Sequence, residues 1–333
     1  MRGNRGSSII AVLALAPFGA LGCSGTGGGG SSAGSSSAAT AAPTGAAAPG
    51  ATAPPSAAPP TPSPGVPLVG GPADPSAAGP YSTTQVTLNV TTAGQSSTID
   101  VRMPVAPTTP RPLVVINHGW LSTTALYTTI ADHLASRGFV AALFQQPNIT
   151  STSTPDWSTQ LRGAIDALVN ASSGTGSLAG AIDTTRIGVM GHSYGGATVI
   201  YATGDDPRIK TCVALAPVNQ FWSSQIEAQA AKIAVPFHVE AAQDDVLAIP
   251  AIYPKPFYDA ATQAPSKLYI EIAGASHSVF CDTAVGSAPF VTFQQFSTAW
   301  LEHFLAGNPD PAGWTDGTMA QQDLTAGSLS DVH

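Results

Sequence analysis

The feature that most constrains the fold is an alternation, from residue 113 to residue 305, of short apolar runs with helix-like stretches. The first run, 113–116, reads Leu-Val-Val-Ile, and such unbroken apolar runs are typical of strands buried on both faces of a sheet. Strand–helix alternation of this length predicts an α/β fold with a mostly parallel central sheet covered by helices on both faces. We expect further strands at 139–144, 187–190, 211–215, 235–241 and 268–272, and helices at 124–136, 156–168, 194–203, 257–262 and 291–305.

Two strands of another kind precede this region. Apolar residues occupy alternate positions in 86–90 and again in 99–103, with Gly94 between the two stretches. A period of two with a glycine turn predicts two antiparallel strands, each with one buried face.

Composition divides the chain into four parts. Residues 6–73 contain no charged side chain, and 24–69 is almost wholly Gly, Ser, Ala, Thr and Pro. Such a segment buries too little apolar surface to offset its ordering entropy, so we expect a disordered tether over 24–80. The stretch 81–308, of about 230 residues, suffices for one catalytic domain. The polar, Gly-rich residues 309–333 predict a loosely ordered tail.

The N-terminus has the pattern of an export signal over 1–23. Arg2 and Arg5 supply positive charge, and the apolar stretch 9–21 is short for a membrane span. The run Ala20-Leu21-Gly22-Cys23 resembles a bacterial lipobox, in which lipidated Cys23 becomes the mature N-terminus. We therefore expect an exported, membrane-anchored lipoprotein; the alternative is a plain secretory signal and a secreted or periplasmic protein.

The charge and the cysteines of the chain bear on two questions, nucleic-acid binding and disulfide formation. The net charge is −8, only 10% of residues are charged, and no basic patch is present to hold phosphates, which argues against nucleic acid. Cys212 and Cys281 are the cysteines left after Cys23. An exported protein could pair them, but their positions in a strand and beyond a distant loop favour two separate thiols.

The chemistry begins at residues 187–195, Ile-Gly-Val-Met-Gly-His-Ser-Tyr-Gly. Here G-x-S-x-G follows an expected strand and opens an expected helix, the context that a nucleophile elbow requires. The flanking glycines allow strand and helix to approach closely and allow the serine a strained backbone conformation. We therefore assign Ser193 as the nucleophile.

A serine nucleophile needs a base, and the chain offers seven histidines. Only His277 lies in a loop directly after a late strand. The other six lie in helices, in a strand, at the last residue, or just before the oxyanion and nucleophile positions: His118, His133, His192, His238, His303 and His333. The order serine, acid, histidine of this fold is met by His277.

The acid should follow the preceding strand, between Ser193 and His277. Residues 239–245 read Val-Glu-Ala-Ala-Gln-Asp-Asp, so the choice lies between Asp244 and Asp245. We favour Asp245 as the acid that orients the imidazole, and Asp244 as its solvated neighbour.

The developing oxyanion needs two backbone donors. One should be the amide of Tyr194, directly after the nucleophile. The other should come from the loop after Ile116, and we assign it to the amide of Trp120, with Leu121 as the alternative. We expect the Trp120 side chain to line the acyl site. This chemistry needs no metal and no organic cofactor.

Three runs resemble the bacterial cutinases and poly(ethylene terephthalate) hydrolases of the dienelactone hydrolase-like α/β-hydrolases. They are 183–193 around the nucleophile, 134–140 (Leu-Ala-Ser-Arg-Gly-Phe-Val) and 274–278 around His277. The run 193–200, together with Asn-His-Gly at 117–119, is also similar to the platelet-activating-factor acetylhydrolases. The resemblance covers roughly 83–305 and implies the α/β-hydrolase fold, the same triad and the same oxyanion amides.

The chain departs from the polyester hydrolases at three places. Tyr194 stands where they usually have methionine. Val218 follows the pair Ala216-Pro217, where they have a tryptophan, and Trp222 is the candidate replacement for that aromatic side chain. Some of these enzymes also have a disulfide beside the catalytic loop, for which Cys281 has no evident partner in the acid strand. We expect Trp120, Tyr194, Val218 and Trp222 to contact substrate.

These features predict a monomeric, exported serine esterase with an open cleft and no large lid, which cleaves small esters, acyl lipids or polyesters. An esterase of the platelet-activating-factor acetylhydrolase type would use the same triad on acyl lipids. A non-catalytic binding protein would need a broken triad, and a peptidase would be expected to have an additional domain. Contact with a membrane is expected only through the N-terminal anchor.

Overall fold

The computed structural model describes residues 73–310 and 312–333, all of which belong to one compact unit of the chain, Ala57–His333. The proposed signal sequence, Cys23 and most of the proposed tether lie outside the described residues. No helix in the described ranges is long and apolar enough to cross a bilayer.

The centre of the molecule is a nine-stranded sheet, in the order β1-β2-β4-β3-β5-β6-β7-β8-β9. The strands from β4 to β8 in this order are parallel, whereas β1, β2 and β9 pair antiparallel at the two ends. The strands are β1 (Thr83–Thr92), β2 (Gln95–Pro104), β3 (Arg111–Asn117), β4 (Val140–Phe144), β5 (Ile182–His192), β6 (Ile209–Leu215), β7 (Phe237–Ala242), β8 (Lys267–Ile272) and β9 (Leu329–Val332).

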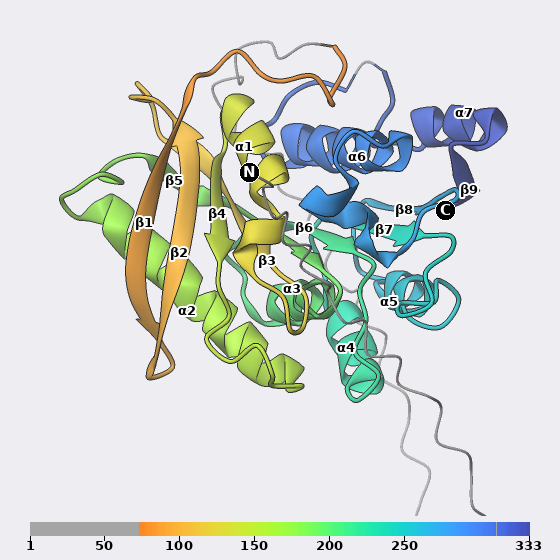
Figure 1. The fold of residues 1–333 in the computed structure, drawn as a ribbon, viewed down its shortest axis with the longest axis horizontal. Coiled ribbons are helices and arrows are strands. Elements are labelled where there is room, and N and C mark those ends of the chain that lie inside the picture. Colours follow the sequence, from red (N-terminus) through yellow and green to blue (C-terminus); the bar gives the residue numbers. More distant parts are fainter. Residues whose placement is uncertain (1–72, 311) are drawn as a thin grey trace, which may run out of the picture. The chain divides into compact units, whose positions relative to one another are not determined.

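Helices cover both faces of this sheet, which confirms the predicted fold class (Figure 1). The core on one face contains residues of α1 and α6, and the core on the other contains residues of α2, α3, α4 and α5. The helices are α1 (Thr128–Ser136), α2 (Thr154–Ser173), α3 (Tyr194–Asp205), α4 (Ser223–Ala230), α5 (Pro254–Ala260), α6 (Ala288–Phe304) and α7 (Thr318–Ala326), with short 3-10 turns η1 (Thr124–Leu126), η2 (His277–Phe280) and η3 (Asp282–Ala284).

Strand β3 illustrates how the apolar runs produce two cores. Val114 and Ile116 belong to the core under α1 and α6, whereas Leu113 and Val115 belong to the core on the opposite face. Because successive side chains of a strand point to opposite faces, both faces are apolar only if the run is unbroken. The parallel strands also bring their carboxyl ends to one edge, where the loops after β3, β5, β7 and β8 start.

The C-terminal residues do not form the expected loosely ordered tail. Residues 318–326 form α7, and 329–332 form β9, which pairs with β8. The physical reason is that β8 would otherwise end the sheet with unpaired backbone groups, and that Ala320 and Leu329 are buried in the core. The prediction failed because the segment is mostly polar, and only these two apolar residues show that it packs on the domain.

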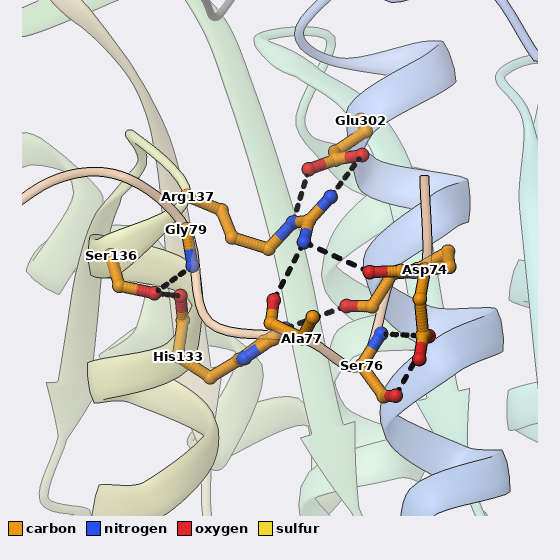
Figure 2. A network of polar contacts seen from close by, with 9 residues as sticks. Asp74, Ser76, Ala77, Gly79, His133, Ser136, Arg137 and Glu302 are labelled. Atoms are coloured by element: carbon orange, nitrogen blue, oxygen red, sulfur yellow. Dashed lines mark hydrogen bonds and ion pairs between the residues drawn. The ribbon is translucent and has the colours of Figure 1, made fainter. Parts of the chain in front are cut away.

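The last residues of the expected tether are also part of the folded domain. Arg137, at the end of α1, donates hydrogen bonds to the carbonyls of Asp74 and Ala77 and pairs with Glu302 of α6 (Figure 2). The amide of Gly79 donates to the hydroxyl of Ser136 at 2.9 Å. Residues 74–80 of the expected tether therefore belong to the folded domain, and we call residues 74–81 the N-terminal clamp.

Two further details differ from the sequence-based expectation. Helix α4 was not predicted, and α2 begins at Thr154 with Ser153 as its cap rather than at Asp156. Cys212 and Cys281 are free thiols that lie in the cores on opposite faces of the sheet, which confirms the prediction that they do not pair.

Candidate active site

Ser193 lies on the sharp turn between β5 and α3. Its backbone has φ 60° and ψ −123°, an unusual conformation for a residue with a side chain. A side chain at Gly191 would collide with the carbonyl of Gly195, and one at Gly195 would collide with the carbonyl of Asn117. The glycines of G-x-S-x-G therefore let strand and helix pack closely enough to form this turn.

Asp245 and His277 meet at the ends of β7 and β8. The Asp245 Oδ2 lies 2.6 Å from the His277 Nδ1, while Oδ1 accepts the amides of Leu247 and Ala248, each at 2.8 Å. The Asp245 side chain is fully buried, whereas that of His277 is 18% exposed. Asp244, the alternative acid, is exposed and contacts the His277 loop through its backbone amide.

One ring contact links the turn that carries Ser193 to the loop that carries His277. The ring of His192, directly before Ser193, lies 4.6 Å from the ring of His277, measured between centroids. Four residues thus lie at the carboxyl edge of the sheet: His192 as the last residue of β5, Ser193 directly after it, Asp245 after β7 and His277 after β8. A serine, a histidine and a buried carboxylate at one edge of the sheet are the groups that acyl transfer through a serine would use.

The backbone amides near Ser193 differ in what they bind. The amide of Leu121 donates to the carbonyl of Ile149 at 3.1 Å, so this N–H is not free to bind an oxyanion. No hydrogen bond to the amide of Trp120 is found within the described part of the chain. Tyr194 is the first residue of α3, where a helix leaves its amides without a partner inside the helix. This pattern favours Trp120 over Leu121 as an oxyanion donor.

The orientation of the Trp120 amide is set through His118. The His118 Nδ1 donates to the carbonyl of Gly119 at 2.7 Å, and its Nε2 accepts the amide of Gln146 at 2.9 Å. Burial lowers the pKa of His118 to about 4, so the imidazole stays neutral with this arrangement of its proton. Since the peptide unit is planar and trans, fixing the Gly119 carbonyl directs the Trp120 N–H to the opposite side.

Comparison with known proteins places the chain in a family. A family model described as PET hydrolase-like matches residues 62–310. This chain belongs to the PET hydrolase-like family. It is a carboxylic ester hydrolase with the α/β-hydrolase fold.

Three relatives illustrate the similarity. Cutinase 1 of Thermobifida cellulosilytica is 31% identical over 195 residues, which are 58% of this chain and 68% of the relative. A cutinase of Thermobifida fusca (strain YX) is also 31% identical over 195 residues, 58% of this chain and 59% of the relative. A bis(hydroxyethyl) terephthalate hydrolase of Streptomyces coelicolor is 30% identical over 193 residues, 58% of this chain and 56% of the relative.

The residues expected to contact substrate are not all in one place in this PET hydrolase-like protein. The ring of Trp120 stacks on that of Tyr194, with 5.7 Å between centroids and 25° between planes. The amide of Val218 donates to the carbonyl of Ser193 at 3.2 Å, so Val218 lies beside the candidate nucleophile. Trp222 instead packs against the core on the face of α2 to α5, and no aromatic ring contact with Trp120 or Tyr194 is found in the described ranges. The structure does not support Trp222 as the replacement aromatic.

Sequence reasoning missed a set of exposed apolar side chains at the carboxyl edge of the sheet. Eight large apolar side chains are exposed in the described residues, and seven of them lie in the connections that leave the carboxyl ends of β3, β6, β7 and β8. We call these seven residues the apolar rim: Leu121, Phe221, Val246, Leu247, Ile249, Ile252 and Val285. The eighth, Val105, follows β2 at the opposite edge. The apolar pair Val246-Leu247, directly after the expected acid, was the available sequence signal.

Proposed function

We propose that this ester hydrolase is a serine esterase that uses Ser193, His277 and Asp245. The observation that carries the proposal is the short contact of 2.6 Å between His277 and a fully buried Asp245, next to a serine with a positive φ at the start of α3. His277 takes the proton of Ser193 as the hydroxyl attacks the ester carbonyl, and Asp245 stabilises the charged imidazole. Water then attacks the acyl-enzyme, with His277 again as the base.

The oxyanion of each tetrahedral intermediate is held by the amides of Trp120 and Tyr194. The commitment of the Leu121 amide to Ile149 supports this pair. The positive end of α3 adds to the stabilisation, because Tyr194 is its first residue. Apart from the attacking water, the mechanism uses only groups that the chain itself supplies.

The substrate that fits best is an insoluble, uncharged polyester. The apolar rim supports this, since seven exposed apolar side chains around one site are costly in water and useful against an apolar solid. The curated relatives include enzymes named cutinase and bis(hydroxyethyl) terephthalate hydrolase. The stacked rings of Trp120 and Tyr194 provide an apolar wall for the acyl group.

Export and anchoring complete the proposal. Residues 1–23 act as the signal, Cys23 carries the lipid, residues 24–73 are the tether, and 81–308 contain the catalytic machinery. The N-terminal clamp supports the end of the tether at residue 73, because residues 74–81 are bound to α1 and α6. Metabolic labelling with a radioactive fatty acid tests this arm, with Cys23→Ser as the unlabelled control.

The enzymatic arm is tested by hydrolysis of p-nitrophenyl esters from C2 to C16 and of amorphous polyester film. We expect the highest activity on short chains, release of soluble products from the film, and loss of both in Ser193→Ala. Labelling of the wild type by a fluorophosphonate, and not of Ser193→Ala, gives a second readout at the serine. Ester hydrolysis that survives in folded Ser193→Ala would overturn the proposal.

A further inference from the structure

A buried histidine beside the nucleophile takes no part in the proposed chemistry. His192 is 4% exposed, and each of its ring nitrogens has a partner. Its Nε2 lies 3.0 Å from the backbone carbonyl of His277, and its Nδ1 lies 2.9 Å from the hydroxyl of Tyr127. Tyr127 is also buried, at 2% exposure. The buried side chains of His192 and Tyr127 therefore link the backbone of His277 to the start of α1.

The direction of these hydrogen bonds follows from their chemistry. A carbonyl oxygen only accepts, so the proton of a neutral His192 resides on Nε2 and Nδ1 is the acceptor. Burial lowers the pKa of His192 well below its usual value, with a further contribution from His277, so the neutral form is the one present. The Tyr127 hydroxyl then donates to Nδ1 and accepts the amide of Gly119 at 3.3 Å.

These hydrogen bonds are connected to the His277 loop a second time, through the start of α1. Tyr127 directly precedes α1, and the carboxylate of Asp282 accepts the amide of Thr128 at 2.9 Å and its hydroxyl at 2.6 Å. Asp282 lies five residues after His277, on the same connection between β8 and α6. The start of α1 is thus held from the His277 loop, and Tyr127, directly before α1, in turn hydrogen-bonds to His192.

We propose that Tyr127 and His192 form one positioning unit, which fixes the carbonyl of His277 relative to the amide of Gly119. The Gly119 N–H belongs to the peptide unit directly before the one that carries the N–H of Trp120, the proposed oxyanion donor, so the unit sets the spacing between the base and the oxyanion site. The inference rests on the serine mechanism proposed above. Both residues act through others, because neither reaches the surface from which substrate enters.

Four variants test the unit by kinetics on soluble p-nitrophenyl acetate: Tyr127→Phe, His192→Gln, His192→Phe and the double variant Tyr127→Phe/His192→Phe. Misalignment of the reacting groups acts on the chemical step, so we expect Tyr127→Phe to lower kcat about tenfold and to change KM less than about twofold. Glutamine keeps one donor and one acceptor, whereas phenylalanine keeps only the ring that packs beside Phe280. His192→Gln should therefore retain more of kcat than His192→Phe.

The double variant shows whether the two residues act as one unit. If they do, adding Tyr127→Phe to His192→Phe should not lower kcat any further. Full kcat in Tyr127→Phe, a loss confined to KM, equal losses in the two His192 variants, or additive losses in the double variant would each overturn the proposal. Wild type against Ser193→Ala reports separately on the serine mechanism.

A readout without catalysis keeps the two proposals distinguishable. In nitrogen-15 spectra of the histidine rings, we expect the protonated Nε2 and unprotonated Nδ1 of His192 in the wild type. The Tyr127→Phe variant should shift the ring signals of both His192 and His277. His277 signals that do not move in a folded Tyr127→Phe protein would overturn the positioning unit, whatever the fate of the serine mechanism.

Discussion

At the scale of single residues, Asp245 can be separated from Asp244 by its surroundings. Asp245 is buried and bonded to His277 and to two amides, whereas Asp244 is exposed. We expect Asp245→Asn to lower kcat on p-nitrophenyl acetate by about 10⁴-fold, because an amide favours the wrong tautomer of the imidazole. Asp244→Asn is the matched control and should stay within about twofold of the wild type. Equal losses in both variants would contradict the assignment.

Part of the site could be predicted from sequence because its residues follow strands. Ser193, Asp245 and His277 each come within five residues of the end of a strand, and the carboxyl ends of parallel strands share one edge. Tyr127 and His192 carried no such signal. Their pairing spans 65 positions along the chain, and a tyrosine before a helix has the same pattern whether it packs or donates a hydrogen bond.

At the scale of elements, unbroken apolar runs predicted strands well, and short polar elements were missed. Every strand from β3 to β8 was expected near its observed place, because burial on both faces leaves a pattern that polar loops do not imitate. Helix α4 and helix α7 bury few side chains: α4 has three buried residues and α7 has one. Such helices depend on contacts with distant neighbours, which the local sequence does not reveal.

The start of α1 gives a prediction at this scale. The Asp282 carboxylate accepts the amides of Thr128 and Thr129 and the hydroxyl of Thr128, and so caps the helix from another segment. We expect Asp282→Ala to lower the free energy of unfolding by about 1–2 kcal/mol, measured by urea denaturation. Asp316→Ala is the comparison: it removes a bond to Thr318 within its own exposed turn and should cost less. A larger loss in Asp316→Ala would contradict this ranking.

At the scale of the whole molecule, the apolar rim should act on solids and not on dissolved esters. We expect the double variant Phe221→Ser/Val246→Ser to lower the ratio of film hydrolysis to p-nitrophenyl acetate hydrolysis several-fold, because adsorption loses two exposed apolar side chains. Val105→Ser, at the opposite edge, is the control and should leave the ratio as in the wild type. A fall of the same size in both variants would show that the position of the rim does not matter.

Neutral buried histidines make the fold sensitive to acid. Burial lowers the pKa of His118 and of His133 to about 4, against 6.5 in the unfolded chain. Between these values the unfolded chain binds a proton that the folded one does not, so the free energy of unfolding falls as pH drops from about 6.5 towards 4. Each of these histidines should lower the free energy of unfolding by about 2 kcal/mol between pH 7 and pH 5.

His133 allows this effect to be measured away from the site, because its Nε2 donates to the carbonyl of Pro75 in the N-terminal clamp. Glutamine can supply the same donor without taking up a proton. We expect His133→Gln to lose about 2 kcal/mol less than the wild type between pH 7 and pH 5, by urea denaturation at each pH. An unchanged pH dependence would contradict the assignment.

The position of the N-terminal clamp also sets how the candidate site is oriented when the domain is attached to a support. Arg137 lies just before β4 begins, so the clamp is at the amino edge of the parallel strands, opposite the candidate site and the apolar rim. The other end of the chain leaves on the same side, because His333 pairs with Tyr269 in the first half of β8. A bead or a cellulose-binding module joined directly to the N-terminal clamp or to His333 would therefore leave the entrance turned outward, which suits the enzyme to immobilisation and display.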